Sequence, residues 1–89
     1  MGNKLLILTK EDCPQCMILK NFLEYGLGGK YDDSIKFIKK EEDTDSYMLY
    51  VEKYSVSSLP AVINDSDGKM VSGTDFVNVQ EMLKELSGE

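Results

Sequence analysis

The feature that most constrains this chain is the segment Cys13-Pro14-Gln15-Cys16, which holds both cysteines of the protein. It follows the apolar run 5–8, which is typical of a buried strand, and it opens an amphipathic stretch. Residues three apart on a helix share a face, so the two sulfur atoms come within reach of a disulfide bond. A helix start also offers free amides and the positive end of the helix dipole, which favour a thiolate. The spacing therefore predicts a dithiol that carries an electron pair.

The composition is that of one small folded domain, residues 1–89. The chain has 89 residues, of which 42% are hydrophobic, enough for a single modest core. The sequence contains neither a basic start followed by an apolar segment nor a run of about eighteen apolar residues. We therefore expect no secretory signal and no membrane association. A cysteine pair in such a chain predicts a reducing, cytoplasmic location, where it is catalytic rather than a structural staple.

Charge and residue content exclude several kinds of site. The net charge is −6, from 16 acidic and 10 basic residues, whereas a nucleic-acid partner requires a basic face. The chain has no histidine, which excludes Cys–His and Ser–His catalysis and metal sites with a histidine ligand. A structural zinc site needs four ligands, and the two cysteines supply only half of them. We expect neither a bound metal ion nor a nucleic-acid partner.

Hydrophobic periodicity and turn residues predict the element order βαβαββα. The predicted strands cover residues 4–9, 34–39, 61–63 and 69–71. The first predicted helix runs from Pro14 to about Tyr25, the second starts from a cap at Thr44 or Asp45, and the third follows a cap at 73–75. Residues 64–68 form the turn of a hairpin. The first two strands, joined through a helix, should lie parallel with a right-handed crossover.

Three further patterns favour structural roles. Tyr47, Tyr50 and Tyr54 recur at helical spacing, which indicates core and rim positions rather than a binding stripe. The acidic run 41–43 is expected to be a solvated stretch. Asp65 and the residues after it faintly resemble a calcium loop, but the later bidentate glutamate is missing, so a turn is expected.

Three landmarks, taken in order, resemble those of glutaredoxins within the thioredoxin superfamily. The segment from Lys10 to Cys16 resembles the glutaredoxin K-x-x-C-P-x-C motif. Leu59-Pro60, ahead of a strand, resembles the cis-proline loop. Gly73-Thr74-Asp75 resembles the G-x-D that holds the γ-glutamyl end of glutathione. The resemblance covers nearly the whole chain and implies a minimal thioredoxin fold of the α/β class, with a four-stranded mixed sheet flanked by three helices.

Two departures leave the electron source open. Glutaredoxins usually carry Tyr where this chain has Gln15, and Gln there is similar to the glutaredoxin-like donors of ribonucleotide reductase, which thioredoxin reductase recharges. Those donors, however, carry an aromatic-Ser-Gly-Phe stretch that residues 71–74 match poorly. The thioredoxin motif W-C-G-P-C is absent. The resemblance thus indicates the class of protein without naming its reductant.

The places of the two cysteines on the helix suggest their roles. Cys13, at the N-cap, is predicted to be the exposed nucleophile, because only a thiolate attacks a disulfide. Cys16, one turn into the helix, is predicted to be more buried and to act as the resolving thiol. Pro14 makes the turn rigid. Lys10 is either an ordinary surface lysine or, together with the first-turn amides, a group that lowers the pKa of the Cys13 thiol below that of a free cysteine.

The resemblance also implies a site for glutathione and for extended substrates. Leu59, just before a cis Pro60, would offer its backbone N–H and C=O to an extended substrate. Thr74 and Asp75, at a helix start, would receive the charged ends of glutathione, although the same residues also serve as a helix cap. Gln15 belongs to the same predicted site, in place of an aromatic wall beside the sulfur.

From these features we predict an enzyme, a dithiol thiol–disulfide oxidoreductase of the glutaredoxin type. Through a Cys13/Cys16 cycle it would reduce protein disulfides and glutathione mixed disulfides, with glutathione as a reductant that is not tightly bound. The first alternative is a donor to a partner such as ribonucleotide reductase, recharged by thioredoxin reductase. The second is a binding module in which Cys13 and glutathione ligate an iron–sulfur cluster between two protomers. We otherwise expect a monomer.

Overall fold

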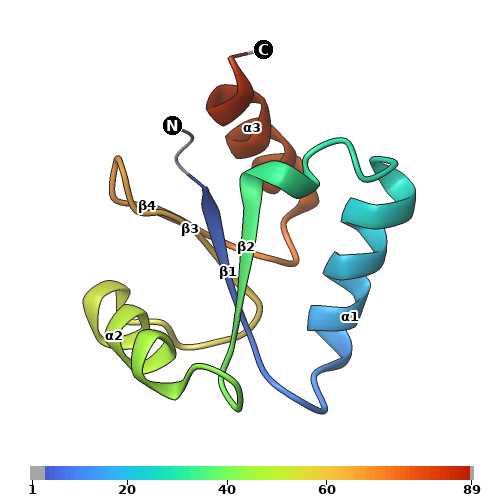
Figure 1. Cartoon of the computed structure of the whole chain (residues 1–89). Helices are drawn as coiled ribbons and strands as arrows, with labels where there is room; N and C mark the ends of the chain where they lie inside the picture. Colours follow the sequence, from blue (N-terminus) through green and yellow to red (C-terminus); the bar gives the residue numbers. More distant parts are fainter. Residues whose placement is uncertain (1–3, 89) are drawn as a thin grey trace.

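The structure, a computed structural model, describes residues 4–88 and has the predicted element order (Figure 1). Its strands are β1 (Leu5–Thr9), β2 (Ile35–Lys39), β3 (Ala61–Asn64) and β4 (Lys69–Ser72). Its helices are α1 (Pro14–Asn21), α2 (Thr44–Tyr54) and α3 (Phe76–Ser87). Within residues 4–88, no helix is both long enough and apolar enough to cross a bilayer.

The four strands form one mixed sheet in the order β2-β1-β3-β4, which confirms the predicted fold class. β1 pairs with β2 in parallel and with β3 in antiparallel orientation, while β3 and β4 form the predicted hairpin. All five residues of β1 are buried. A central strand covered on both faces accounts for its uninterrupted apolar run.

Helices cover both faces of the sheet: α1 and α3 lie on one, and α2 on the other (Figure 1). Alternation along β1 divides the core between the two layers, because successive side chains of a strand point to opposite faces. Leu5 and Ile7 pack under α1 and α3, with Leu19 and Leu83 among their neighbours. On the other face, β1 contributes Leu6 and Leu8. Their cluster contains Ile38, Tyr47, Ala61 and Ile63.

The topology brings two loops together at one end of the sheet. β1 and β2 run parallel, so the loop that leads from β1 into α1 and the loop that leads from β2 into α2 leave at the same end (Figure 1). The amide of Lys40 donates a hydrogen bond to the carbonyl of Thr9, N···O 2.9 Å, just beyond the last paired residues. This end therefore places the cysteine segment beside the start of α2.

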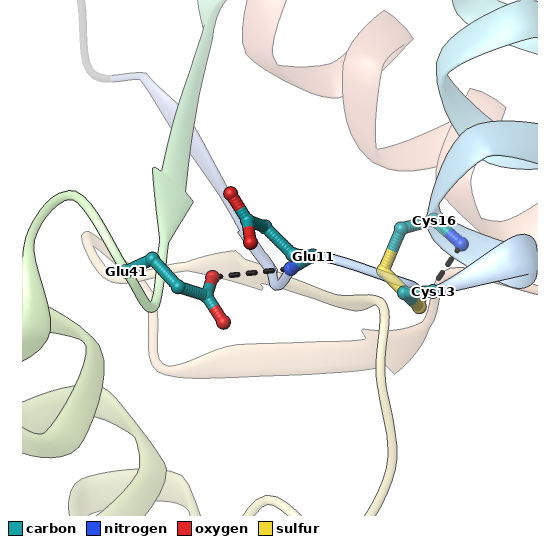
Figure 2. The surroundings of a disulfide bond; sticks show 4 residues. All are labelled: Glu11, Cys13, Cys16 and Glu41. Carbon is teal, nitrogen blue, oxygen red and sulfur yellow. Dashed lines mark hydrogen bonds between the residues drawn. A yellow bond between two sulfur atoms is a disulfide. The ribbon is translucent and has the colours of Figure 1, made fainter.

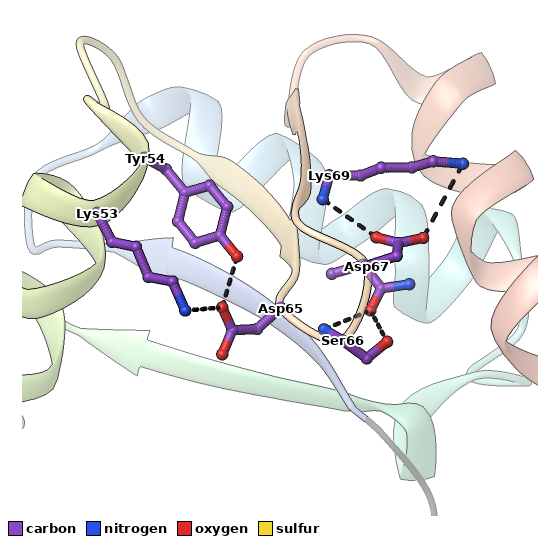
Figure 3. Close-up of polar contacts among 7 residues, drawn as sticks. Lys53, Tyr54, Asp65, Ser66, Asp67 and Lys69 are labelled. Atoms are coloured by element: carbon purple, nitrogen blue, oxygen red, sulfur yellow. Dashed lines mark hydrogen bonds and ion pairs between the residues drawn. The ribbon is translucent and has the colours of Figure 1, made fainter.

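The opposite end of α2 is tied to the turn between β3 and β4. Lys53 Nζ and the Tyr54 hydroxyl both donate to Asp65 Oδ1, the former at 2.7 Å (Figure 3). The Asn64 side chain accepts from Ser66 within the same turn. Asp65 thus has a structural partner on α2, in agreement with the expected turn.

The bounds of each strand differ from the prediction by one residue, and two larger differences concern the helical segments. The α-helical part of α1 ends at Asn21, and a π-helical turn, Phe22–Gly26, completes the stretch predicted as one helix. The spacing of apolar residues does not distinguish a π-helical turn from an α-helix here, because Phe22 and Leu23 face inward as they would in an α-helix. A short 3₁₀ turn, Asp32–Ser34, precedes β2 and was not predicted.

The cap of α2 is Asp43, rather than Thr44 or Asp45. Its carboxylate accepts the amide of Ser46 at 3.3 Å, as an N-cap side chain does for the third residue of a helix. The hydroxyl of Thr44 instead donates to the carbonyl of Lys40 at 2.7 Å. The acidic run that was expected to be only solvated therefore contains the helix cap.

Candidate redox site

Cys13 and Cys16 form a disulfide within the first turn of α1, with their Cα atoms 5.2 Å apart (Figure 2). Cys13 is the N-cap, in an extended conformation with φ −118° and ψ 97°, and Pro14 follows at the first helical position. Proline suits that position because its missing N–H has no partner in a helix start. The predicted pairing of the two sulfurs on one helix face is thus present.

The helix start supplies a hydrogen-bond donor to the first sulfur. The amide of Cys16 donates to Cys13 Sγ at 3.3 Å (Figure 2), and the amide of Met17 donates to the Cys13 carbonyl at 3.2 Å. In the reduced protein a thiolate would occupy the place of this Cys13 sulfur. The same amide would then stabilise its negative charge, together with the helix dipole.

The predicted difference in exposure between the two cysteines is largely absent. Cys13 is 7% exposed and Cys16 is 4% exposed, so both are buried. The expectation of an exposed Cys13 is therefore wrong for this oxidised state. The physical reason is that the disulfide turns the sulfur of Cys13 toward that of Cys16 instead of toward solvent.

A depression of about 370 Å³ opens beside Cys13 on the side of α2 and the loop before β3. We call it the proline-side groove. Five of the predicted site residues line it: Lys10, Cys13, Pro14, Gln15 and Leu59. Residues 56–58, which line the groove on the side of the loop before β3, were not singled out from the sequence. They directly precede the Leu59-Pro60 landmark, which is the signal that marks them.

Two side chains of α2, Tyr47 and Val51, complete the wall of the proline-side groove. Tyr47 is buried in the core below α2, as predicted, and it also borders the groove. Burial, and secondarily the charge of Glu41, raise the pKa of the Tyr47 phenol, which stays protonated and neutral near pH 7. The predicted parallel pairing of β1 with β2 brings the start of α2 to the cysteine segment, but it does not indicate which side chain of α2 borders the groove.

A second depression, of about 350 Å³, borders the disulfide on the side of α1 and β2. Both cysteines line it, together with Met17, Lys20 and Lys39. Lys10 borders this depression as well as the proline-side groove. Lys10, an exposed residue, thus borders both depressions beside the disulfide, and its predicted effect on the Cys13 thiol stays a prediction.

The Leu59–Pro60 peptide bond is cis, as the resemblance implies. Pro60 is buried and its carbonyl accepts the amide of Gly73 at 2.8 Å. A Cβ atom on Gly73 would lie 2.4 Å from Pro60 Cγ and 2.9 Å from Leu19 Cδ2. Glycine is needed here because the turn before α3 packs directly on Pro60 and on α1. From the sequence, Gly73 was predicted as part of the helix cap and of the G-x-D resemblance, and its packing against Pro60 was not predicted.

Thr74 and Asp75 lie next to this contact but border neither depression. Asp75 is the N-cap of α3, as predicted, and its carboxylate accepts the backbone amide of Asn78 at 3.2 Å and the side-chain amide at 2.5 Å. The hydroxyl of Thr74 is 2.8 Å from that of Ser72. Their predicted contact with glutathione stays a prediction.

No protein-family model matches the chain, and no curated protein is similar to it in sequence. Several solved structures are similar to it in fold, among them the following two. The thioredoxin-like protein BC3987 is 26% identical with a TM-score of 0.67, and the match covers 88% of this chain and 97% of that protein. A mutant of BC3987 is 25% identical with a TM-score of 0.68, over 90% of this chain and 99% of that one. The chain therefore has a thioredoxin-like fold, and its close Cys13–Cys16 pair is suited to thiol redox chemistry.

Proposed function

We propose that this protein is a dithiol thiol–disulfide oxidoreductase that reduces disulfides of other proteins. The observation that carries the proposal is the Cys13–Cys16 disulfide at the start of α1, with the Cys16 amide donating to the Cys13 sulfur. The proline-side groove gives a substrate a place to lie beside Cys13. Leu59 borders that groove shortly before β3 begins, and it is our candidate for pairing with an extended substrate.

The proposed cycle begins with the reduced protein. The Cys13 thiolate attacks one sulfur of a substrate disulfide, which forms a mixed disulfide and releases the other substrate sulfur as a thiolate that takes up a proton. The Cys16 thiol gives up its proton and attacks the Cys13 sulfur. This step forms the Cys13–Cys16 bond and frees the second substrate thiol. The substrate gains an electron pair from the protein and two protons, of which one comes from the Cys16 thiol and the other from solvent.

Glutathione is the proposed reductant. Two glutathione thiols would return the electron pair to the protein and leave as glutathione disulfide. Lys10 supplies a cation in the proline-side groove, suited to a glutathione carboxylate, and Leu59 supplies a backbone edge in the same groove. Gly73 packs the turn that carries Thr74 and Asp75 against Pro60, next to Leu59.

A second candidate keeps the chemistry but takes its electrons from thioredoxin reductase. Two observations favour it. Thr74 and Asp75 border neither depression beside the disulfide, and the Asp75 carboxylate is already engaged by Asn78. Gln15 also lines the groove at the position where an aromatic wall would stand in a glutaredoxin.

The test follows NADPH consumption by the wild-type protein with a protein disulfide such as that of insulin as the acceptor. One arm contains glutathione and glutathione reductase, and the other contains thioredoxin reductase. We expect turnover in the glutathione arm. Faster turnover with thioredoxin reductase would assign the protein to the second candidate. Absence of turnover in both arms, with the reduced protein also unable to reduce the acceptor stoichiometrically, would refute the proposed function.

A further inference from the structure

We propose that Glu41 is a positioning residue for Cys13, because its carboxylate holds the loop that delivers Cys13 to the start of α1. The catalytic meaning of this role rests on the proposed function, whereas the contact itself does not. Glu41 belongs to the acidic run that the sequence indicated as a solvated stretch. The structure instead places it against residues 30 positions earlier in the chain.

The contact is specific. Glu41 Oε1 accepts the backbone amide of Glu11 at 3.1 Å, and Glu11 lies two residues before Cys13 (Figure 2). The side chain of Glu11 in turn pairs with Lys39 Nζ at 3.5 Å. Together with the Lys40–Thr9 backbone hydrogen bond, these contacts join the loop after β1 to the loop after β2.

The loop needs such an external contact because of its conformation. Asp12, between Glu11 and Cys13, has φ +54°, in the left-handed region that side-chain-bearing residues seldom adopt. A conformation of this kind persists only where surrounding contacts fix it. Residues 10–12 belong to neither β1 nor α1, and the Glu41–Glu11 hydrogen bond ties them to a segment far away in the sequence. A hydrogen bond to a carboxylate is also stronger than one to a neutral acceptor.

The position of Glu41 also connects it to the proline-side groove. Its charge contributes, after burial, to the raised pKa of Tyr47, which lines the groove together with Cys13. Lys10 and Asp12, two of the three charged residues of the loop 10–12, line the same groove. If the loop moves, the ammonium of Lys10 and the N-cap geometry of Cys13 move with it. Glu41 therefore acts on the thiol through the loop.

Two variants separate the hydrogen bond of the Glu41 side chain from its charge. E41Q removes the charge but keeps an oxygen acceptor, whereas E41A removes both. E42A is the matched control, because Glu42 carries the same charge on the adjacent residue and only its backbone takes part in the turn, donating to the Lys39 carbonyl. Hydrogen exchange of the Glu11 amide measures the contact directly, and the pH profile of Cys13 alkylation in the reduced protein measures its effect on the thiol. Thermal unfolding checks that each variant is folded.

We expect exchange of the Glu11 amide to be faster in E41A by about threefold to tenfold, the range for loss of one hydrogen bond, with E41Q between E41A and the wild type. We expect the alkylation profile of E41A to lie at higher pH than that of E41Q by about half a pH unit, because both lack the charge and only E41A lacks the acceptor. E42A should match the wild type in exchange.

The inference is overturned if E41A leaves Glu11 exchange at the wild-type level. It is equally overturned if exchange accelerates but E41A and E41Q share one alkylation profile, since the contact would then have no effect on Cys13. Neither measurement requires turnover. A wild-type protein that fails to reduce protein disulfides would therefore refute the proposed function without deciding whether Glu41 positions Cys13.

Discussion

The backbone amide of Cys16 donates a hydrogen bond to the sulfur of Cys13, with N···Sγ 3.3 Å. The hydrogen bond distinguishes the two sulfurs, because the Cys13 sulfur lies at the N-cap of α1 and accepts a hydrogen bond from an amide of the first turn. The two cysteines differ little in exposure, at 7% and 4%, so burial alone does not distinguish the nucleophile. The capping geometry does, because it stabilises a thiolate at Cys13 in particular.

The first prediction tests this asymmetry with single serine variants. Cys13→Ser should abolish all disulfide reduction, because the stabilised thiolate is lost. Cys16→Ser should retain attack by Cys13, and with it the reduction of glutathione mixed disulfides, but should lose reduction of protein disulfides because nothing resolves the intermediate. Both variants are to be assayed with both substrates. Equal activities of the two variants in both assays would contradict the assignment.

The second prediction concerns the thiolate of Cys13 and the side chain of Lys10. Alkylation of the reduced protein by iodoacetamide should show an apparent pKa of Cys13 well below that of a free cysteine. Lys10→Ala should raise that pKa by no more than about one unit, because an exposed charge is screened by solvent. Lys4→Ala, at the far end of β1, is the control and should leave the profile unchanged. A wild-type profile like that of a free cysteine would show that the helix start does not act as argued.

Much of the fold was predictable from the sequence, because the residue pattern of each segment agrees with how that segment packs in the folded protein. The apolar run 5–8 indicated a strand covered on both faces, and Leu5 and Leu6 do pack into different layers. The cap of α2 was misplaced because several acidic and hydroxyl side chains stand in a row, and the sequence alone does not show which one reaches the amide of Ser46. The π-helical turn at Phe22 was not predictable from spacing, because it buries the same residues as an α-helix.

Within the site, the sequence predicted only those residues that belong to a recognisable motif or lie next to one. Cys13 and Leu59 were found because each belongs to a short recognisable segment, and the structure places both in the proline-side groove. Tyr47 and Glu41 were not found, although the parallel pairing of β1 and β2 was predicted, because such a pairing brings two loops to one end of a sheet without showing which of their side chains meet. A tyrosine at helical spacing and a glutamate in an acidic run have no local feature that marks such a contact.

The third prediction concerns the close packing of Gly73. Gly73→Ala should destabilise the protein by about 1–3 kcal/mol, because the new methyl group would overlap Pro60 and approach Leu19 in a packed region. Urea unfolding of the oxidised protein measures the change. Gly68→Asn is the control, since Gly68 faces open space and Asn tolerates its positive φ better than other residues. An unfolding midpoint of Gly73→Ala equal to that of the wild type would rule out the tight contact.

The fourth prediction concerns acid stability and the contact of Asp65 with α2 (Figure 3). Hydrogen bonds from Lys53 and then from Tyr54 lower the pKa of Asp65. A lowered pKa of Asp65 in the folded state stabilises the protein above the pKa that this group has in the unfolded chain, about 3.9. The stabilisation disappears as pH falls through the pKa of the folded state.

Asp65→Asn should therefore be less stable than the wild type at pH 7, with the difference shrinking in acid. Urea unfolding across this range checks it, with Asp33→Asn as the control. A difference that is constant with pH would contradict the argument.

The last prediction addresses the electron donor through Asp75. Its carboxylate caps α3 by accepting the amide of Asn78, so Asp75→Ala would remove the cap together with the charge. Asp75→Asn is the sharper variant, because asparagine is an equally good N-cap, so the cap is kept while the charge and the acceptor for the Asn78 side-chain amide are lost. If glutathione binds here, this change should raise the KM for a glutathione mixed disulfide and leave kcat nearly unchanged, as expected for a lost ground-state contact.

The control for that experiment is reduction of the oxidised variant by thioredoxin reductase, which the loss of a glutathione contact should not alter. Asn78→Ala provides a second control, because it removes the side-chain amide that now engages Asp75 Oδ2 and leaves that oxygen free for a ligand, while the backbone cap to Oδ1 is kept. It should lower the KM or leave it unchanged. If Asp75→Asn leaves the KM at its wild-type value while thioredoxin reductase reduces the protein rapidly, Asp75 is only a helix cap. The protein would then belong with the donors that a flavoprotein reductase recharges.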